Sequence, residues 1–178
     1  MDLFIADMPV WADLDSGGRM IVMIAIGAIF IYIAWKDCRT MKITNRSLAL
    51  LLVFILADTL LYQRGGMGGF DRLAGALCVS APMFLLTLLV PGAFGGGDIK
   101  LMAVCGFWLG WKDCMTAMAV AVITGGVFAA GLLITKSRGR KSHMAFGPFL
   151  IIGILAAFFF GEAMRMGYWK LMGGFGLE

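Results

Sequence analysis

Two aspartates in an otherwise apolar chain are the residues best suited to chemistry. Asp98 follows three consecutive glycines in GGGDIK, and Asp37 follows a long apolar run in AWKDCR. When two carboxyl groups face one pocket, they can share a proton. The ionised group then takes a proton from water, and the protonated group polarises a carbonyl. The pair therefore suggests general acid–base chemistry on water, if the fold brings the two segments together.

The composition indicates that both aspartates belong to a membrane protein. Of the 178 residues, 61% are hydrophobic and only 15% are charged, whereas a soluble domain is about half apolar and about a quarter charged. The apolar residues form long runs, which is typical of a chain that has the bilayer as its solvent. We expect one integral membrane domain over residues 1–178, with residues 1–18 forming a short non-cytoplasmic segment.

The apolar runs predict an all-α polytopic membrane protein with about six transmembrane helices. They cover residues 20–35, 47–62, 73–90, 99–111, 115–135 and 146–164. A spanning helix needs roughly 20 residues to cross about 30 Å of hydrocarbon, and the fourth run is shorter than that. Most of the basic residues fall on one side of these runs, and the positive-inside rule places that side in the cytoplasm. Lys36, Arg39, Lys42, Arg46, Lys100, Lys136, Arg138, Arg140 and Lys141 lie there.

The short fourth run also fixes the expected depth of Asp98. It covers roughly 20 Å, so a helix that reaches the outer face leaves Asp98 on the order of 10 Å beneath the inner one. Non-helical backbone at that depth needs protein or a water-filled cavity around it. We therefore expect a wet pocket on the cytoplasmic side with Asp37 and Asp98 in its wall. Gly95, Gly96 and Gly97 are expected to take strained or positive-φ geometry and to let an extended substrate strand approach.

Metal, cofactor and nucleic-acid chemistry find no support in the sequence. The net charge of +4 fits a role in membrane topology, and no basic stretch is interleaved with aromatic residues as in a strand-binding groove. The cysteines form no C-x-x-C pair, and His143 is the only histidine. The four cysteines are Cys38, Cys78, Cys105 and Cys114.

Three segments carry motifs in a fixed order along the chain. They are DCRTMKITNRSL at residues 37–48, GGGDIKLMAVCGFWLG at residues 95–110 and MAFGPFLIIG at residues 144–153. Together they resemble the first aspartate segment, the G-x-G-D segment and the start of the last core helix of the type IV prepilin peptidases, which are membrane aspartic proteases. Ile43 and Asn45 match the first segment of that family, whereas Thr44 replaces its usual proline.

The resemblance implies an aspartic endopeptidase of the bacterial inner membrane, with its site facing the cytoplasm and with no cofactor or metal. Its partners would be membrane lipids and the prepilins or pilin-like proteins from which it removes the leader peptide. Asp37 and Asp98 would be the catalytic pair, with substrate-binding or supporting roles for Gly95, Gly96, Gly97, Lys100, Asn45, Gly147 and Pro148.

Larger members of that family carry a cysteine-paired cytoplasmic insertion and also methylate the new N-terminus. This chain lacks that insertion between its first two runs and looks more like the short form linked to tight-adherence (Flp) pili. We therefore expect no N-methyltransferase activity.

Other interpretations of the same residues stay open. Inward carboxylates and a broken, Gly-rich helix are also features of small ion-coupled transporters, and a non-catalytic assembly subunit of a pilus or secretion machine would retain only the fold. Asp98 alone could cap a helix. Asp58, inside the second run, could be a third functional acid or form a helix–helix hydrogen bond, and we favour the second. Lys100 could tune the pair or anchor at the interface. The oligomeric state is not indicated.

Overall fold

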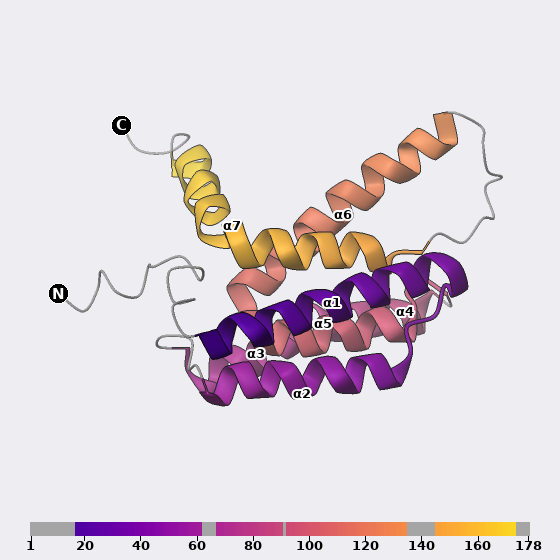
Figure 1. The fold of residues 1–178 in the computed structure, drawn as a ribbon. Coiled ribbons are helices and arrows are strands. Elements are labelled where there is room, and N and C mark those ends of the chain that lie inside the picture. The colour runs from indigo at the N-terminus through magenta and orange to yellow at the C-terminus, as the bar shows by residue number, and fades with distance from the viewer. Residues whose placement is uncertain (1–16, 62–66, 91, 135–144, 174–178) are drawn as a thin grey trace.

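The computed structural model describes residues 17–61, 67–90, 92–134 and 145–173. Within these ranges every regular element is a helix (Figure 1). They are α1 (Gly17–Thr40), α2 (Asn45–Leu61), α3 (Gly69–Cys78), α4 (Ser80–Leu89), α5 (Gly96–Leu109), α6 (Trp111–Ile134) and α7 (Gly147–Gly173). The all-α prediction is confirmed. The predicted N-terminal segment lies outside the described residues up to residue 16, as do His143 and the basic linker before it.

Long apolar stretches in the described part of the chain identify it as a membrane protein. Four are long and apolar enough to cross a bilayer: Gly17–Thr40, Gly69–Leu89, Trp111–Leu132 and Gly147–Met164. α2 has 17 residues and α5 has 14, so they extend only about 26 Å and about 21 Å. The six apolar runs therefore correspond to four helical stretches of spanning length and two shorter helices between them.

The third run is not one continuous helix, because it breaks between α3 and α4 at Val79. That residue has φ −106° and ψ −41°. Pro82, three residues further on, lacks the N–H that would bond to the carbonyl of Cys78, and its ring crowds that carbonyl. The sequence contained this information in Pro82, but an apolar run by itself does not predict where a helix is interrupted.

α5 is the central helix of the bundle. It packs against α2, α3, α4, α6 and α7, whereas α1 packs against α2 and α7 and, among the described residues, makes no close backbone approach to α5. At the α3–α5 crossing a Cβ on Gly75 or on Gly106 would collide with the other helix's backbone, so these glycines let the two backbones touch. The side chains buried on α5 are Asp98, Leu101, Met102, Cys105, Trp108 and Leu109.

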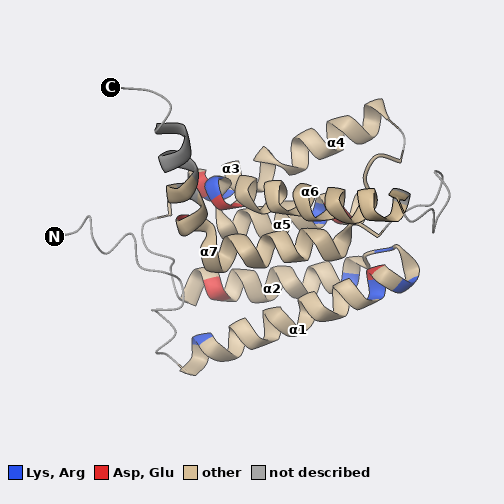
Figure 2. Cartoon of the chain, turned by 90° about the horizontal axis from the view of Figure 1, so that it is seen from above, with Lys and Arg blue, Asp and Glu red and all other residues tan. Residues whose placement is uncertain are grey.

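Charged residues gather at the two ends of the bundle, and the middle is apolar. Figure 2 shows this separation along α1 and α2. One end carries Asp37, Arg39 and Asp98, and the other carries Arg19 and Asp58. The bundle therefore offers two polar regions, and both aspartates singled out by the sequence lie at the same end.

Candidate functional site

Asp37 lies in the last turns of α1 and is almost completely buried, with 4% of its surface exposed. The backbone N–H of Gly147 donates a hydrogen bond of 3.0 Å to its Oδ2. Gly147 is the first residue of α7, and the first N–H groups of a helix have no partner within the helix. The carboxylate of Asp37 therefore caps α7, whose N-terminal end attracts negative charge.

The contact with Asp37 also explains why residue 147 is a glycine. A Cβ at this position would lie 2.6 Å from Oδ2 of Asp37 and 3.0 Å from its Cγ. Any side chain here would push the carboxylate away from the N–H that holds it. Pro148 is the second residue of α7, in the first turn, where a missing N–H is tolerated. The structure thus brings one of the predicted supporting residues, Gly147, to Asp37 itself.

Asp98 lies in the first turn of α5, with 8% of its surface exposed. Its backbone N–H donates to the carbonyl of Gly95 at 3.0 Å, and a Cβ on Gly95 would lie only 3.1 Å from Oδ2 of Asp98. The carboxyl groups of Asp37 and Asp98 are close enough to interact electrostatically. Because α1 and α5 make no direct backbone approach in the described residues, their common neighbours α2 and α7 determine how the two carboxyl groups lie.

The prediction of strained geometry at the three glycines is wrong. Gly95 is extended, with φ −72° and ψ 140°, and Gly96 and Gly97 begin α5. The positive-φ glycines of the described residues are Gly92 and Gly110. Gly97 is required by a close approach instead, since a Cβ there would lie 2.7 Å from Cβ of Ile43. Gly96 has no atom within 4 Å of such a Cβ.

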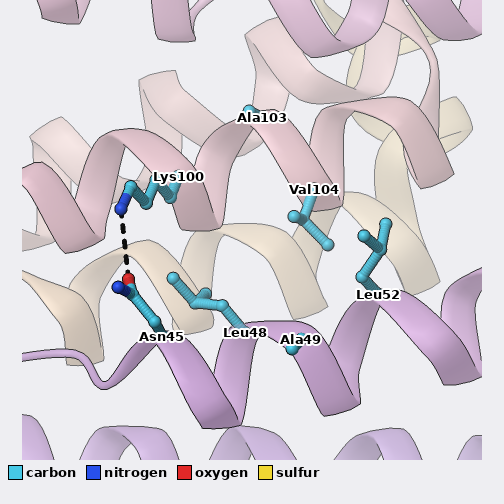
Figure 3. Close-up of a pocket in the computed structure, with 7 residues that line it drawn as sticks. All are labelled: Asn45, Leu48, Ala49, Leu52, Lys100, Ala103 and Val104. Carbon is cyan, nitrogen blue, oxygen red and sulfur yellow. Dashed lines mark hydrogen bonds between the residues drawn. The ribbon is translucent and has the colours of Figure 1, made fainter.

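Lys100 and Asn45 meet across the gap between α5 and α2. The Lys100 Nζ donates a hydrogen bond of 3.1 Å to Asn45 Oδ1, as Figure 3 shows. The two side chains lie together in a groove between these helices whose other walls are apolar. Leu48, Ala49, Leu52, Ala103 and Val104 complete its lining. Neither aspartate lines this groove, so a wet pocket with both carboxyl groups in its wall stays a prediction.

Two contacts near the aspartates were not predicted from the sequence. Ile43 fits against Gly97 and so fixes the segment between α1 and α2 against the start of α5. The rings of Phe94 and Phe146 lie 5.7 Å apart between centroids and join the segments that lead into α5 and α7. Ile43 and Phe146 both stand in the motifs quoted above, but nothing in the sequence indicates which residues they touch.

Asp58 lies at the other end of the bundle, in a helix–helix hydrogen bond. Its Oδ2 accepts a hydrogen bond of 2.8 Å from the indole N–H of Trp108, and its Oδ1 lies 3.6 Å from Nε of Arg19. This is the second of the two alternatives for Asp58. Among the described residues there is no group of three or more His, Cys, Asp or Glu side chains placed to hold a metal ion.

Comparison with known families decides what kind of protein carries this pair of carboxyl groups. A model described as the type IV leader peptidase family matches residues 24–130, which include both Asp37 and Asp98. The chain belongs to this family. Gly147 and Pro148 lie beyond the matched residues of the type IV leader peptidase model, so the place of Gly147 beside Asp37 comes from the structure alone.

Individual relatives bear the name prepilin leader peptidase/N-methyltransferase. The chain is 29% identical over 144 residues to the protein of that name from Bacillus subtilis (strain 168), a match that covers 81% of this chain and 57% of the relative. It is 37% identical over 107 residues to the Burkholderia pseudomallei (strain 1026b) protein, covering 57% of this chain and 32% of the relative. The Legionella pneumophila protein is 36% identical over 89 residues, which is 48% of this chain and 30% of the relative.

The matches thus span about half the length of the relatives or less. No solved structure matches the chain.

Proposed function

We propose that this chain is a membrane-embedded aspartic endopeptidase that removes the leader peptide from prepilins or pilin-like proteins. The observation that carries the proposal is the pair of buried carboxyl groups, Asp37 and Asp98, held within electrostatic reach of each other. Membership of the type IV leader peptidase family and the names of the relatives support the choice of substrate. The proposal covers leader removal alone and includes no methyl transfer.

Two neighbouring aspartates can divide the roles of acid and base between them. Two buried carboxyl groups that repel each other are most stable when they share one proton. In the proposed reaction the ionised carboxylate takes a proton from a water molecule, and that water attacks the scissile carbonyl. The protonated carboxyl donates a hydrogen bond to the same carbonyl oxygen. No covalent intermediate with the protein is needed.

The charge distribution supports a cytoplasmic site in the inner membrane. The end of the bundle with Asp37 and Asp98 also carries Lys36, Arg39 and Lys100, whereas α3 and α6 begin with acidic residues in their first turns. Positively charged residues in short loops at the ends of spans favour the cytoplasmic side. In this orientation a leader peptide on that side meets the two carboxyl groups before it meets the apolar middle of the bundle.

The proposal is tested by Asp37→Asn and Asp98→Asn, each co-expressed with candidate prepilins from the same genome. Asparagine keeps the size of the side chain but cannot act as an acid or a base. We expect each variant to accumulate in the membrane. The rate of leader removal should fall by about 10²- to 10⁴-fold. Intact mass of the prepilin measures the reaction, and Gly126→Ala serves as the control because a Cβ there meets no atom within 4 Å.

The same variants distinguish the other interpretations. If the parent protein supports pilus assembly and both asparagine variants do so equally well, the chain is an assembly subunit. If the parent cuts no prepilin but carries an ion flux that either variant abolishes, it is a transporter. Either result would refute the peptidase assignment.

A further inference from the structure

The polar cluster at the end of the bundle opposite the candidate site is centred on Asp58 of α2. Its carboxyl group is 1% exposed, accepts the indole N–H of Trp108 from α5 at 2.8 Å, and lies 3.6 Å from Arg19 of α1. Arg19 and Trp108 are each 2% exposed. The Trp108 ring stacks on Phe158 of α7 with 4.6 Å between centroids and an interplanar angle of 23°. One carboxyl group therefore connects α1, α2 and α5 directly and α7 through a stacked ring.

The same four helices supply the candidate site at the other end of the bundle. α1 carries Asp37, α2 begins with Asn45, α5 carries Asp98, and α7 begins with Gly147. Figure 2 shows charged residues at both ends of α1 and α2 and none in the middle of these helices. The Asp58 cluster and the site are thus the two ends of one set of helices.

The Asp58 cluster is too far from the site to touch a substrate there. Along α1, Arg19 precedes Asp37 by about 27 Å, and along α5, Trp108 follows Asp98 by about 15 Å. Any effect of the cluster on the site must therefore pass through the positions of the helices. α1 and α5 need such a connection because, in the described residues, their backbones do not approach each other.

Apolar contacts alone leave the axial position of α5 weakly specified. Burial of apolar side chains is non-directional, whereas a hydrogen bond requires a definite distance and angle. A single buried polar residue is known to fix register in helix assemblies. Beyond Asp98 and Lys100 in its first turns, α5 is apolar. The Gly75–Gly106 crossing positions it against α3, and at its far end the bond from Trp108 to Asp58 positions it against α2 and, through Arg19, against α1.

We propose that Asp58 is a positioning residue: its contacts with Arg19 and Trp108 set the axial register of α1 and α5 in which the carboxyl groups of Asp37 and Asp98 meet. The activity readout of this proposal rests on the proposed function, because it measures leader removal. The register itself is measured separately.

Two variants loosen the Asp58 cluster in different ways. Trp108→Phe keeps an aromatic ring to stack on Phe158 but removes the N–H that Asp58 accepts. Asp58→Asn keeps an oxygen for Trp108 but removes the charge that faces Arg19. We expect kcat for leader removal to fall about 10- to 100-fold, the size of effect that a misplacement of about 1 Å causes, with KM changed less than twofold.

The register is measured as a distance between two spin labels near the site. One label goes on the exposed native Cys38 of α1, and the other goes on Lys100→Cys of α5. Cys78 is replaced by serine in every sample, including the parent, so that the two labelled cysteines are the accessible ones. We expect the parent to give one narrow distribution of label-to-label distances. We expect the cluster variants to give a broader distribution, with distances that differ from the parent value by up to ~5.4 Å, the rise of one helical turn.

Thr59→Val is the matched control. Thr59 is the neighbour of Asp58 on α2 and accepts a hydrogen bond of 3.3 Å from the buried Arg72 of α3. The change therefore removes a polar contact from the same end of the same helix but removes none of the contacts among Asp58, Arg19 and Trp108. Arg72 also lies over the ring of Phe107 in α5, 5.9 Å from its centroid, and the change leaves both of those residues in place. We expect parental kcat and a parental distance distribution, even if the melting temperature falls.

The outcomes separate the two proposals. A folded Trp108→Phe protein with a parental distance distribution overturns the positioning role, whatever its kcat. If Trp108→Phe and Asp58→Asn both fail to fold while Thr59→Val folds, the cluster serves stability alone, and the proposal is also overturned. If the label distances broaden as expected but Asp37→Asn still removes leaders, the peptidase mechanism fails and the positioning role stands.

Discussion

At the scale of single residues, the contact between Gly147 and Asp37 is the most demanding feature of the site. It places the start of α7 against a carboxyl group at the end of α1, with 3.0 Å between N and Oδ2. No residue with a side chain fits at position 147 without moving that carboxyl group. Glycine is therefore required at position 147 because it has no side chain, and not because the backbone takes an unusual conformation there.

Gly147→Ala is expected to separate Asp37 from the N–H that holds it. A hydrogen bond to a charged group contributes about 1.5–3 kcal/mol, which corresponds to about 10- to 100-fold in rate if the transition state loses it. Leader removal should fall by that factor while the protein still folds, since alanine is a good helix former. Initial rates on a purified prepilin measure the effect, and unchanged rates would show that the contact does not matter for catalysis.

The shared proton predicts a bell-shaped dependence of activity on pH. On the acid side both carboxyl groups are protonated, so no base remains to activate water. On the alkaline side both are ionised, so no acid remains to polarise the carbonyl. Initial rates of leader removal across pH 4 to 10, in detergent or in liposomes, check this expectation. A rate that is level across that range would mean that the pair does not exchange a proton during the reaction.

At the scale of elements, the start of α5 is held against the segment that joins α1 to α2. The contact is between Gly97 and Ile43, where the backbone of one element touches a side chain of the other. The neighbouring Lys100–Asn45 hydrogen bond joins α5 to the first residue of α2. These two contacts hold the first turn of α5, which carries Asp98, against the start of α2 and the segment before it.

Gly97→Ala and Gly96→Ala form a matched pair that tests this packing. A Cβ at residue 97 would lie 2.7 Å from Cβ of Ile43, whereas one at residue 96 meets nothing within 4 Å. We expect Gly97→Ala to destabilise the protein by about 1–3 kcal/mol and Gly96→Ala to leave the melting temperature unchanged. Thermal unfolding of both proteins in detergent decides the matter, and equal melting temperatures would exclude the close packing.

At the scale of the whole molecule, the orientation of the bundle decides which compartment the site faces. Asp37 and Asp98 lie at one end, and the first turn of α6 lies after the other end of α5. Cys38 follows Asp37 directly and is exposed, so a native residue reports the side on which the site lies.

A membrane-impermeant maleimide tests the orientation. In a Cys78→Ser background, Cys38 should react in inverted inner-membrane vesicles and stay unlabelled in intact spheroplasts, because the positive-inside rule places its end in the cytoplasm. Lys112→Cys with Cys38→Ser is the control and should show the opposite pattern. Labelling of Cys38 from the outside would reverse the proposed topology.

Within the candidate site, the sequence singled out residues but not the contacts between them. Asp37, Asp98, Lys100 and Asn45 stand in recognisable motifs. The structure joins Lys100 to Asn45 by a hydrogen bond and places Asp37 and Asp98 within electrostatic range of each other. The contact of Gly147 with Asp37 and the packing of Ile43 against Gly97 could not be predicted in the same way. Each depends on a side chain packing directly against the backbone of a glycine, Asp37 against Gly147 and Ile43 against Gly97, and that follows from how whole helices pack.

The sequence by itself determined the all-α membrane class, the approximate extent of the helices and the two carboxyl groups. These follow from local composition, because each apolar stretch partitions into the bilayer and forms its backbone hydrogen bonds within itself. Only the tertiary structure decided that the first N–H of α7 binds Asp37, that Gly97 before Asp98 serves close packing, and that Asp58 joins α1 to α5. Those contacts join residues far apart in the chain, so they depend on the relative position of helices that composition leaves open.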